Sequence, residues 1–142
     1  MDSTGPSQII EAERSAYLEE LSEADPDWPA DVRAVYRKLR DRLFDWGGVE
    51  AQKILADCGI RGHDVYSRFR HVTGHGIKEF VVHHRIELAK RLLRYESLTV
   101  SQVAMAVGYD SPGGFCATFK RHSGKTPGAF RQESGSRKEE WS

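Results

Sequence analysis

The hydrogen-bonding side chains best suited to recognition chemistry are gathered in residues 63–72. Four of them recur at helical spacing and would share one face of a helix: His63, Tyr66, Ser67 and Arg70. The opposite face is apolar and carries Val65, Phe69 and Val72. No nucleophile stands beside a base, and no pair of acids faces a plausible cleft. The pattern therefore indicates recognition through hydrogen bonds and no catalysis.

The segment that follows this face occurs twice in the chain. From Phe69 it reads Phe-Arg-His-Val-Thr-Gly-His-Gly-Ile-Lys-Glu-Phe, and from Phe119 it reads Phe-Lys-Arg-His-Ser-Gly-Lys-Thr-Pro-Gly-Ala-Phe. Phenylalanines coincide at both ends, and Gly74 coincides with Gly124. Such repetition indicates one supersecondary unit used twice. Two copies are too few for a solenoid, so each unit must bury its apolar face against neighbouring helices.

The residues before Phe119 carry the signals of two short helices. Thr99 with Gln102 is a capping-box pattern that begins a helix, and Gly108 ends it, because glycine adopts a positive φ at little cost. Ser111 followed by Pro112 predicts the N-cap and first residue of a second helix. Two short helices joined by a tight glycine turn predict a helix-turn-helix unit.

The first copy has the same layout, with one helix over about residues 49–58 that ends at Gly59 and a second over about 63–72. Between the copies, residues 77–95 read as one unbroken helix. At roughly 1.5 Å per residue it spans about 28 Å, close to the ~34 Å between successive major grooves on one side of a duplex. This length suits two reading helices held one turn of DNA apart.

These elements predict an all-α chain with two homeodomain-like helix-turn-helix subdomains, a long linking helix and an extra acidic N-terminal helix. We expect an acidic N-terminal arm at 1–28, a first helix-turn-helix unit at 29–76, the linker helix at 77–95, a second unit at 96–132 and a disordered tail at 133–142. Further helices are expected over about 8–22 in the arm and about 30–46 in the first unit.

Several spaced motifs occur in the order of a known pattern. They are Phe69, Thr73-Gly74, Arg85-Ile86-Glu87-Leu88-Ala89, Leu92-Leu93, Val100, Val103-Ala104, Val107-Gly108-Tyr109, Ser111-Pro112, Phe115, Phe119-Lys120-Arg121, Gly124, Pro127 and Phe130-Arg131. With them, residues 59–131 resemble the DNA-binding domain of the AraC/XylS family of bacterial transcription regulators.

The resemblance implies seven helices and transcription regulation through asymmetric operators read in two adjacent major grooves. Double-stranded promoter or operator DNA is then the partner, RNA polymerase is a candidate second partner, and no cofactor is expected. In full-length members a separate effector-binding or dimerisation domain accompanies this module, and none is visible in this sequence.

The zero net charge conceals a strong polarity. Residues 1–31 carry nine acids and one base, whereas residues 32–142 carry twelve acids, twenty bases and all six histidines. The resulting −8 and +8 are typical of a nucleic-acid-binding face beside an acidic arm. The acidic helix has three interpretations: an extra packing helix, a surface for a partner or a homodimer, or an arm that competes with DNA for the basic face.

Base contacts are expected from the two reading helices. The candidates are His63, Tyr66, Ser67, Gly113, Cys116 and Ala117. The first three can hydrogen-bond to base edges. The second helix instead offers small residues that permit close approach, and Cys116 or Ala117 would touch a thymine methyl. We therefore expect the first unit to supply most of the discrimination between bases.

Phosphate contacts are expected from basic side chains and one helix N-terminus. The candidates are Arg70, Arg85, Ser111, Lys120, Arg121 and Lys125. For Arg70 we favour a contact with a phosphate, and a contact with a guanine base is the alternative. Phosphate contacts give affinity without sequence information, so the second unit should mainly anchor the backbone and sense its shape.

Other functions are less well supported by the residues. His71 and His75 are separated by the helix-ending Gly74 and lack further metal ligands nearby, so no metal is expected. A redox role for Cys116 is not favoured, because a free cysteine on a helix is usually inert. The runner-up is a protein-interaction module on the same scaffold with weak, non-specific DNA binding. RNA binding is not favoured, because no aromatic stacking sheet is evident.

The cysteines and the lack of targeting segments indicate the cellular compartment. Cys58 and Cys116 lack zinc-type spacing and fit a reduced cytosolic protein. No signal peptide or membrane-spanning run is evident, so we expect no membrane partner and a location in the cytoplasm, at the nucleoid.

Overall fold

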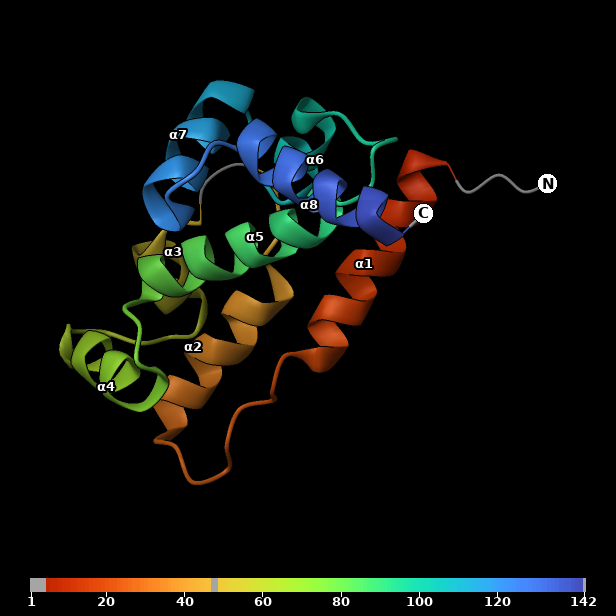
Figure 1. Cartoon of the computed structure of the whole chain (residues 1–142). Helices are drawn as coiled ribbons and strands as arrows, with labels where there is room; N and C mark the ends of the chain where they lie inside the picture. The colour runs from red at the N-terminus through yellow and green to blue at the C-terminus, as the bar shows by residue number, and fades with distance from the viewer. Residues whose placement is uncertain (1–4, 47–48, 142) are drawn as a thin grey trace.

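The computed structural model describes residues 5–46 and 49–141, with side chains described as far as residue 134. Within these ranges every regular element is a helix (Figure 1). The helices are α1 (Pro6–Glu20), α2 (Ala30–Asp41), α3 (Ala51–Asp57), α4 (Asp64–Thr73), α5 (Ile77–Leu93), α6 (Val100–Ala106), α7 (Pro112–Ser123) and α8 (Pro127–Trp141). The predicted all-α fold is confirmed.

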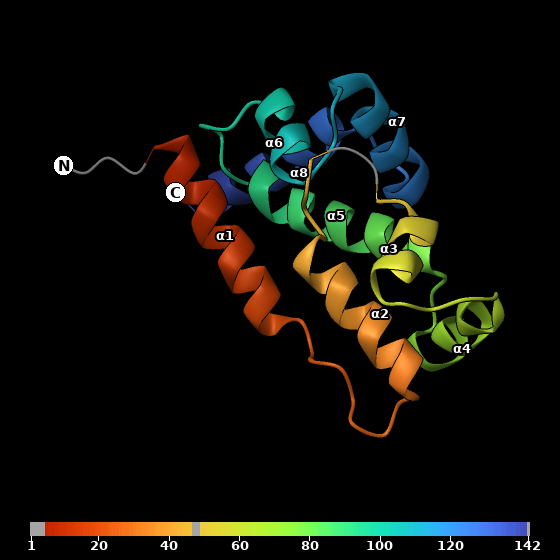
Figure 2. The ribbon, with the colours of Figure 1, turned by 180° about the vertical axis from the view of Figure 1, so that it is seen from behind.

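The helices form two small bundles on a central rod. α2, α3 and α4 make up the first helix-turn-helix unit, α6, α7 and α8 make up the second, and α5 runs between them. Figures 1 and 2 show α4 and α7 flanking one end of α5, whereas α1 lies toward its other end. The two predicted reading helices therefore share one side of the molecule.

The sequence repeat is also a structural repeat. Gly74 and Gly124 end α4 and α7 with φ of 83° and 87°, left-handed conformations that glycine adopts without strain. The hydroxyl one residue earlier, on Thr73 or Ser123, donates to the carbonyl oxygen four residues back at 2.7 Å in both copies. The same local interactions thus terminate both reading helices and turn the chain into the next helix.

The predicted helix starts of the second unit are confirmed by their caps. The Thr99 hydroxyl accepts the Gln102 N–H at 3.0 Å, and the Gln102 side chain accepts the Thr99 N–H at 2.8 Å. Ser111 accepts the Gly114 N–H at 3.2 Å, with a proline at the first helical position. These caps satisfy donors that a helix N-terminus otherwise leaves unpaired.

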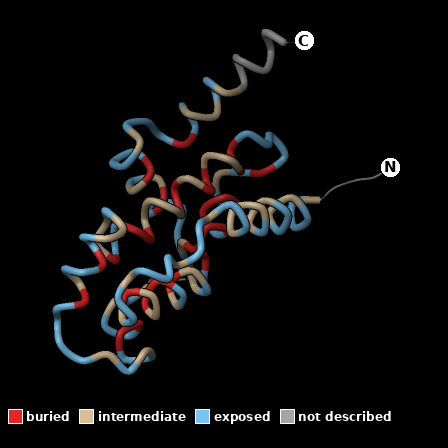
Figure 3. Tube along the Cα trace, turned by 90° about the horizontal axis from the view of Figure 1, so that it is seen from below, coloured by how far each residue is buried: buried red, intermediate tan, exposed pale blue. Residues whose placement is uncertain are grey.

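The core follows α5 through the middle of the molecule. In Figure 3 the buried residues lie along the inside of the trace and the exposed ones along its outside. The buried apolar side chains of α5 are Ile77, Phe80, Val81, Ile86, Leu88, Ala89, Leu92 and Leu93. Phe69 of the first unit and Phe115 and Phe119 of the second are fully buried against this rod.

Two helix ends differ from the sequence expectation. α2 ends at Asp41 instead of near residue 46, since Leu43 and Phe44 are buried in the turn that follows and Trp46 is left 68% exposed. Residues 133–141 continue α8, where the sequence predicts a disordered tail. A nucleated helix extends at little cost, and this segment is rich in glutamate, arginine and lysine, which favour helix.

A buried arginine joins the two units. Arg85 of α5 is only 3% exposed. Its Nε donates to the Leu43 carbonyl oxygen and its Nη2 to that of Asp45, both at 2.8 Å, in the loop after α2. Its Nη1 donates to the Gly108 carbonyl oxygen of the second unit at 3.1 Å. One guanidinium therefore fixes the first unit relative to the second.

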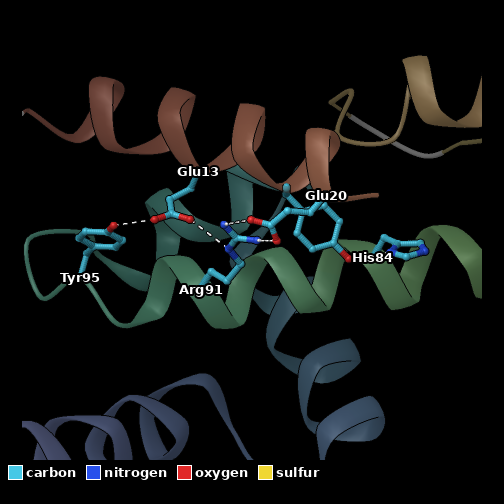
Figure 4. A network of polar contacts seen from close by, with 6 residues as sticks. Glu13, Glu20, His84, Arg91 and Tyr95 are labelled. Atoms are coloured by element: carbon cyan, nitrogen blue, oxygen red, sulfur yellow. Dashed lines mark hydrogen bonds and ion pairs between the residues drawn. The ribbon is translucent and has the colours of Figure 1, made fainter. Parts of the chain in front are cut away.

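The acidic helix α1 packs along α5 through an ionic network (Figure 4). Arg91 Nε lies 3.0 Å from Glu13 Oε1, and Arg91 Nη1 lies 2.9 Å from Glu20 Oε1. The Tyr95 hydroxyl donates to the second oxygen of Glu13 at 2.6 Å. This helix packs on α5 and lies away from α4 and α7, so it does not cover the faces of these two helices; a role toward a partner or a second copy stays a prediction.

A second contact of α1 involves His84. The Tyr17 hydroxyl and His84 Nδ1 are 2.6 Å apart, and both rings are half-buried. Burial raises the pKa of Tyr17, which therefore stays protonated and donates. Burial, with the nearby rings of His83 and His75, lowers the pKa of His84 to about 4. The His84 ring is therefore neutral, and its Nδ1 accepts the hydrogen bond from the Tyr17 hydroxyl.

Substitution of Gly108 tests the contact between the units. Gly108 has φ of +106°, and an added Cβ would lie 2.6 Å from Arg85 Cζ and 2.7 Å from the Asp45 carbonyl oxygen. We expect Gly108→Ala to lower the free energy of unfolding by at least about 2 kcal/mol in urea denaturation. Gly113→Ala, where a Cβ meets nothing within 4 Å, is the control and should be neutral or stabilising. Equal effects of the two substitutions would contradict the account.

His84 makes stability depend on pH in a defined direction. Its pKa is about 4 in the folded protein and about 6.5 in an unfolded chain. The unfolded state therefore binds more protons in this window, so stability is complete above about pH 6.5 and declines toward pH 4. Between about pH 7 and pH 5 we expect the wild type to lose about 1 kcal/mol more in urea unfolding than His84→Gln, after allowing for the ring's partial exposure. The same loss in both proteins would exclude His84 as the cause.

Candidate nucleic-acid interface

The outer face of α4 carries the predicted base-contact residues. His63 is the N-cap of the helix, and His63 and Ser67 are exposed, whereas Tyr66 is half-buried. The rings of His63 and Tyr66 are stacked with centroids 5.9 Å apart. Val65 and Phe69 are buried on the opposite face, as the helical spacing predicts. The hydrogen-bonding groups are thus gathered at the N-terminal half of the helix, the part that enters a major groove in helix-turn-helix proteins.

Arg70 completes this face and is held by the start of α5. Its Nη1 lies 3.1 Å from Glu79 Oε1, and both side chains are more than half exposed. The Gly76 N–H and then Arg70 hold the pKa of Glu79 below its usual value. An exposed ion pair of this kind is weak, so a phosphate can replace Glu79 as the partner of Arg70.

The outer face of α7 is built from small residues. Gly113, Gly114 and Ala117 are exposed, and Cys116 is half-buried. An added Cβ at Gly113 would meet no atom within 4 Å, so this face is open. Lys120 is exposed one turn after Cys116. The helix offers close approach and positive charge at its C-terminal half, and few groups that can hydrogen-bond to bases.

The predicted phosphate contacts fall into two groups. Arg121 and Lys120 are exposed on α7, Ser111 is exposed at its N-cap, and Lys125 is exposed and pairs with Glu133. Arg85 is buried, and its guanidinium donates to main-chain carbonyl oxygens of both units. The prediction that Arg85 contacts a phosphate is therefore wrong, because the side chain fills a gap inside the fold.

Three histidines that the sequence does not connect meet beside these helices. The rings of His75 and His83 are stacked at 5.0 Å, and those of His83 and His122 are 5.6 Å apart. His122 lies three residues after Phe119, as Val72 lies three residues after Phe69, and its ring lies against His83 of α5. Among the described residues, no three histidine, cysteine or acidic side chains are placed to hold a metal ion.

No helix within the described ranges is both long enough and apolar enough to cross a membrane.

The electrostatic division seen in the sequence is preserved in space. The acidic α1 lies toward one end of α5, and the basic turns of α4 and α7 lie at the other. The last turns of α4 and α7 therefore bring positive charge to this end of the molecule, which favours an anionic partner.

Comparison with known proteins also indicates a helix-turn-helix domain. A family model described as a helix-turn-helix domain matches residues 56–133. The MmsAB operon regulatory protein of Pseudomonas aeruginosa is 29% identical over 102 residues, covering 72% of this chain and 33% of the relative. A putative AraC-like transcription regulator of Streptomyces lividans is 39% identical over 123 residues, covering 82% and 39%. The regulator MtrA of Neisseria gonorrhoeae is 30% identical over 137 residues, covering 92% and 44%. The chain thus spans less than half the length of these relatives.

Solved structures share the fold. The DNA-binding domain of AdpA, a global transcriptional factor solved with a target DNA, superimposes with a TM-score of 0.66 at 24% identity, covering 77% of this chain and 96% of that domain. A DNA-binding transcriptional dual regulator from Escherichia coli K-12 superimposes with a TM-score of 0.62 at 16% identity, covering 80% and 99%. At these identities the likeness concerns the fold alone.

Proposed function

The chain belongs to the AraC/XylS family of helix-turn-helix transcription regulators, which are DNA-binding proteins and not enzymes, and on that premise we propose that α4 and α7 enter adjacent major grooves of one duplex. The main support is the Arg85 contact, which fixes the two units relative to one another. Both reading helices then approach DNA from one side of the molecule. A rigid pair of readers gains affinity, because the second helix binds without a further loss of freedom.

We propose that α4 supplies most of the base discrimination. His63, Tyr66 and Ser67 all carry hydrogen-bonding atoms at the exposed N-terminal half of the helix. Because base edges in the major groove are distinguished by donors and acceptors, such groups discriminate more strongly than small apolar residues do. Arg70 would exchange its contact with Glu79 for a backbone phosphate.

In the same proposal, α7 chiefly anchors the backbone. Gly113, Cys116 and Ala117 would allow close approach and apolar contact with thymine methyl groups. Lys120, Arg121 and Lys125 would bind phosphates, and the N-terminus of α7 at Ser111 would bind another through its N–H groups and dipole.

We also propose where the protein acts and which partners it meets there. Such a regulator would act in the cytoplasm at the nucleoid, where RNA polymerase is available as a partner. A homodimer through α1 would use the outer side of that helix, because the inner side is packed on α5.

The division between the helices is tested with duplexes selected from a random pool. Single substitutions His63→Ala, Tyr66→Phe and Ser67→Ala should each change base preference, with about 1–3 kcal/mol of discrimination lost at one position. Gly113→Ala and Ala117→Ser, measured in the same way, should change it less. Equal effects in α4 and α7 would refute the division, and equal affinity of the wild type for random and selected duplexes would refute sequence-specific binding itself.

Lys120 provides a test of backbone anchoring. Lys120→Ala should weaken binding to all duplex sequences alike and reduce the slope of log affinity against log salt by about one unit. Lys90→Ala is the matched control, because Lys90 pairs with Glu87 at 3.0 Å beside the cleft between α1 and α8. An effect of Lys120→Ala at a single base position only would contradict a phosphate contact.

A further inference from the structure

Arg68 of α4 makes its contact inside the first unit. It directly follows Ser67 in the chain, but its side chain reaches back to α2. Its Nε donates to Asp31 Oδ2 at 3.1 Å, and its Nη2 donates to the same oxygen. Asp31 belongs to the first turn of α2, which lies beside α4 in Figure 1. The contact therefore joins a reading helix to the neighbouring helix of its own unit.

The carboxylate of Asp31 is held on both of its oxygens. Oδ1 accepts the Val32 N–H at 2.8 Å, and Oδ2 accepts the two donors of Arg68. The hydrogen bond from Arg68 lowers the pKa of Asp31 below its usual value, although burial opposes this effect. Asp64, one turn earlier on α4, is a second acid whose charge acts on the guanidinium. Arg68 thus has its counter-charge within the protein.

This contact differs from that of Arg70, the other arginine of α4 that pairs with an acid. The side chain of Asp31 is 24% exposed, whereas that of Glu79, the partner of Arg70, is 58% exposed. Arg68 also places two donors on its acid. An ion pair that is shielded from water and held by a fork of donors is less readily exchanged for another anion than an exposed one. Arg68 is therefore suited to a lasting contact inside the protein.

The second unit has a contact at the equivalent position. Thr118 is the counterpart of Arg68 in the repeat, because each directly precedes the buried phenylalanine of its reading helix. The side chain of Thr118 is hydrogen-bonded to that of Tyr109, in the turn before α7. The matching turn residue of the first unit is Ile60, whose side chain has no polar atom. Each reading helix is thus tied to its own unit from the same position, with a different partner.

Such a tie matters because packing alone determines the rotation of α4 about its axis only weakly. The helix is packed through Val65 and Phe69, its two buried side chains. Apolar burial has no direction, whereas hydrogen bonds between a guanidinium and a carboxylate do. Recognition by hydrogen bonds requires side chains held within about 0.5 Å and about 10–20° of the productive geometry. The residue next to Ser67 is well placed to supply that constraint.

We propose that Arg68 is a positioning residue, whose contact with Asp31 fixes the rotation of α4. The base discrimination by His63 and Ser67 then depends on a side chain that touches neither base nor phosphate. This inference rests on the proposed function, since it concerns the same reading helix. Without the contact, α4 can rotate in the major groove and its hydrogen bonds to base edges weaken. Phosphate contacts persist, because long basic side chains can follow a small rotation.

The test compares the dissociation constant of a selected duplex with those of duplexes in which one base pair is changed. The α4 segment of the site is the one whose base preference Ser67→Ala alters. Arg68→Ala and Asp31→Ala should each reduce the discrimination in this segment by about five-fold, the lower end of what one base contact supplies. Discrimination in the rest of the site should be unchanged. The double variant should lose no more than either single one, because both substitutions remove the same contact.

Three further variants serve as controls. Arg68→Lys keeps the charge but loses the planar fork of donors, so it should lose discrimination as Arg68→Ala does. Arg37→Ala is the matched control, since Arg37 of α2 is exposed and pairs with no acid among the described residues, and it should leave discrimination unchanged. Asp31→Asn keeps an acceptor for the Val32 N–H and replaces Asp31→Ala if circular dichroism shows that the latter does not fold.

Two results would overturn the inference while leaving the proposed function intact. One is that Arg68→Ala weakens binding to all sequences alike and lowers the salt slope by about one unit, whereas Arg68→Lys binds as the wild type does, which would make Arg68 a phosphate contact. The other is unchanged discrimination in folded Arg68→Ala and Asp31→Ala, which would leave the pair a role in stability alone. Failure of the wild type to distinguish selected from random duplexes would instead refute the proposed function, and this inference with it.

Discussion

The arrangement of the molecule depends on the buried guanidinium of Arg85. Removing an arginine from water is unfavourable unless its donors find partners, and here they find carbonyl oxygens of Leu43, Asp45 and Gly108. The first two belong to the turn after α2 and the third to the turn between α6 and α7. Because these partners come from both units, any rotation of one unit would leave a buried charge without its hydrogen bonds. That penalty keeps the reading helices in one relative orientation.

Arginine serves the same purpose at other helix ends. Arg131 of α8 donates to the Leu93 and Tyr95 carbonyl oxygens at 2.8 Å and 3.1 Å, at the end of α5. Arg14 of α1 donates to the Ala106 carbonyl oxygen at 2.7 Å and 3.0 Å, at the end of α6. The last carbonyl groups of a helix lack partners within it, and a guanidinium reaches them with several donors at once. Short helices are thereby joined into a single rigid platform, and α1 is part of it.

Much of this fold follows from local signals in the sequence. The caps at Thr99 and Ser111 and the glycine at position 124 act within a few residues, so their effect can be predicted from the neighbouring sequence alone. The repeat of Phe69 and Phe119 shows that the unit is used twice. The face of α4 with His63 and Ser67 follows from helical periodicity in the same way.

The sequence signals are weaker where distant segments meet. Arg85 lies four residues after Val81 and three before Leu88, an inward position on α5, yet arginine is usually read as a surface residue. The carbonyl groups that stabilise it come from loops at residues 43–45 and 108, which no periodicity connects. The rings of His75, His83 and His122 meet for the same reason, through packing of separate helices on α5. Contacts of this kind depend on the assembled fold.

A change in the spacing of a bound site tests the central claim most directly. If Arg85 holds α4 and α7 in one orientation, insertion of about half a helical turn, roughly five base pairs, between the two contacted segments turns one segment to the far side of the duplex. We predict that affinity then falls to that for random DNA, and that insertion of a full turn does not restore it because α5 cannot lengthen. Undiminished affinity for the half-turn site, measured by fluorescence anisotropy, would contradict a rigid pair of reading helices.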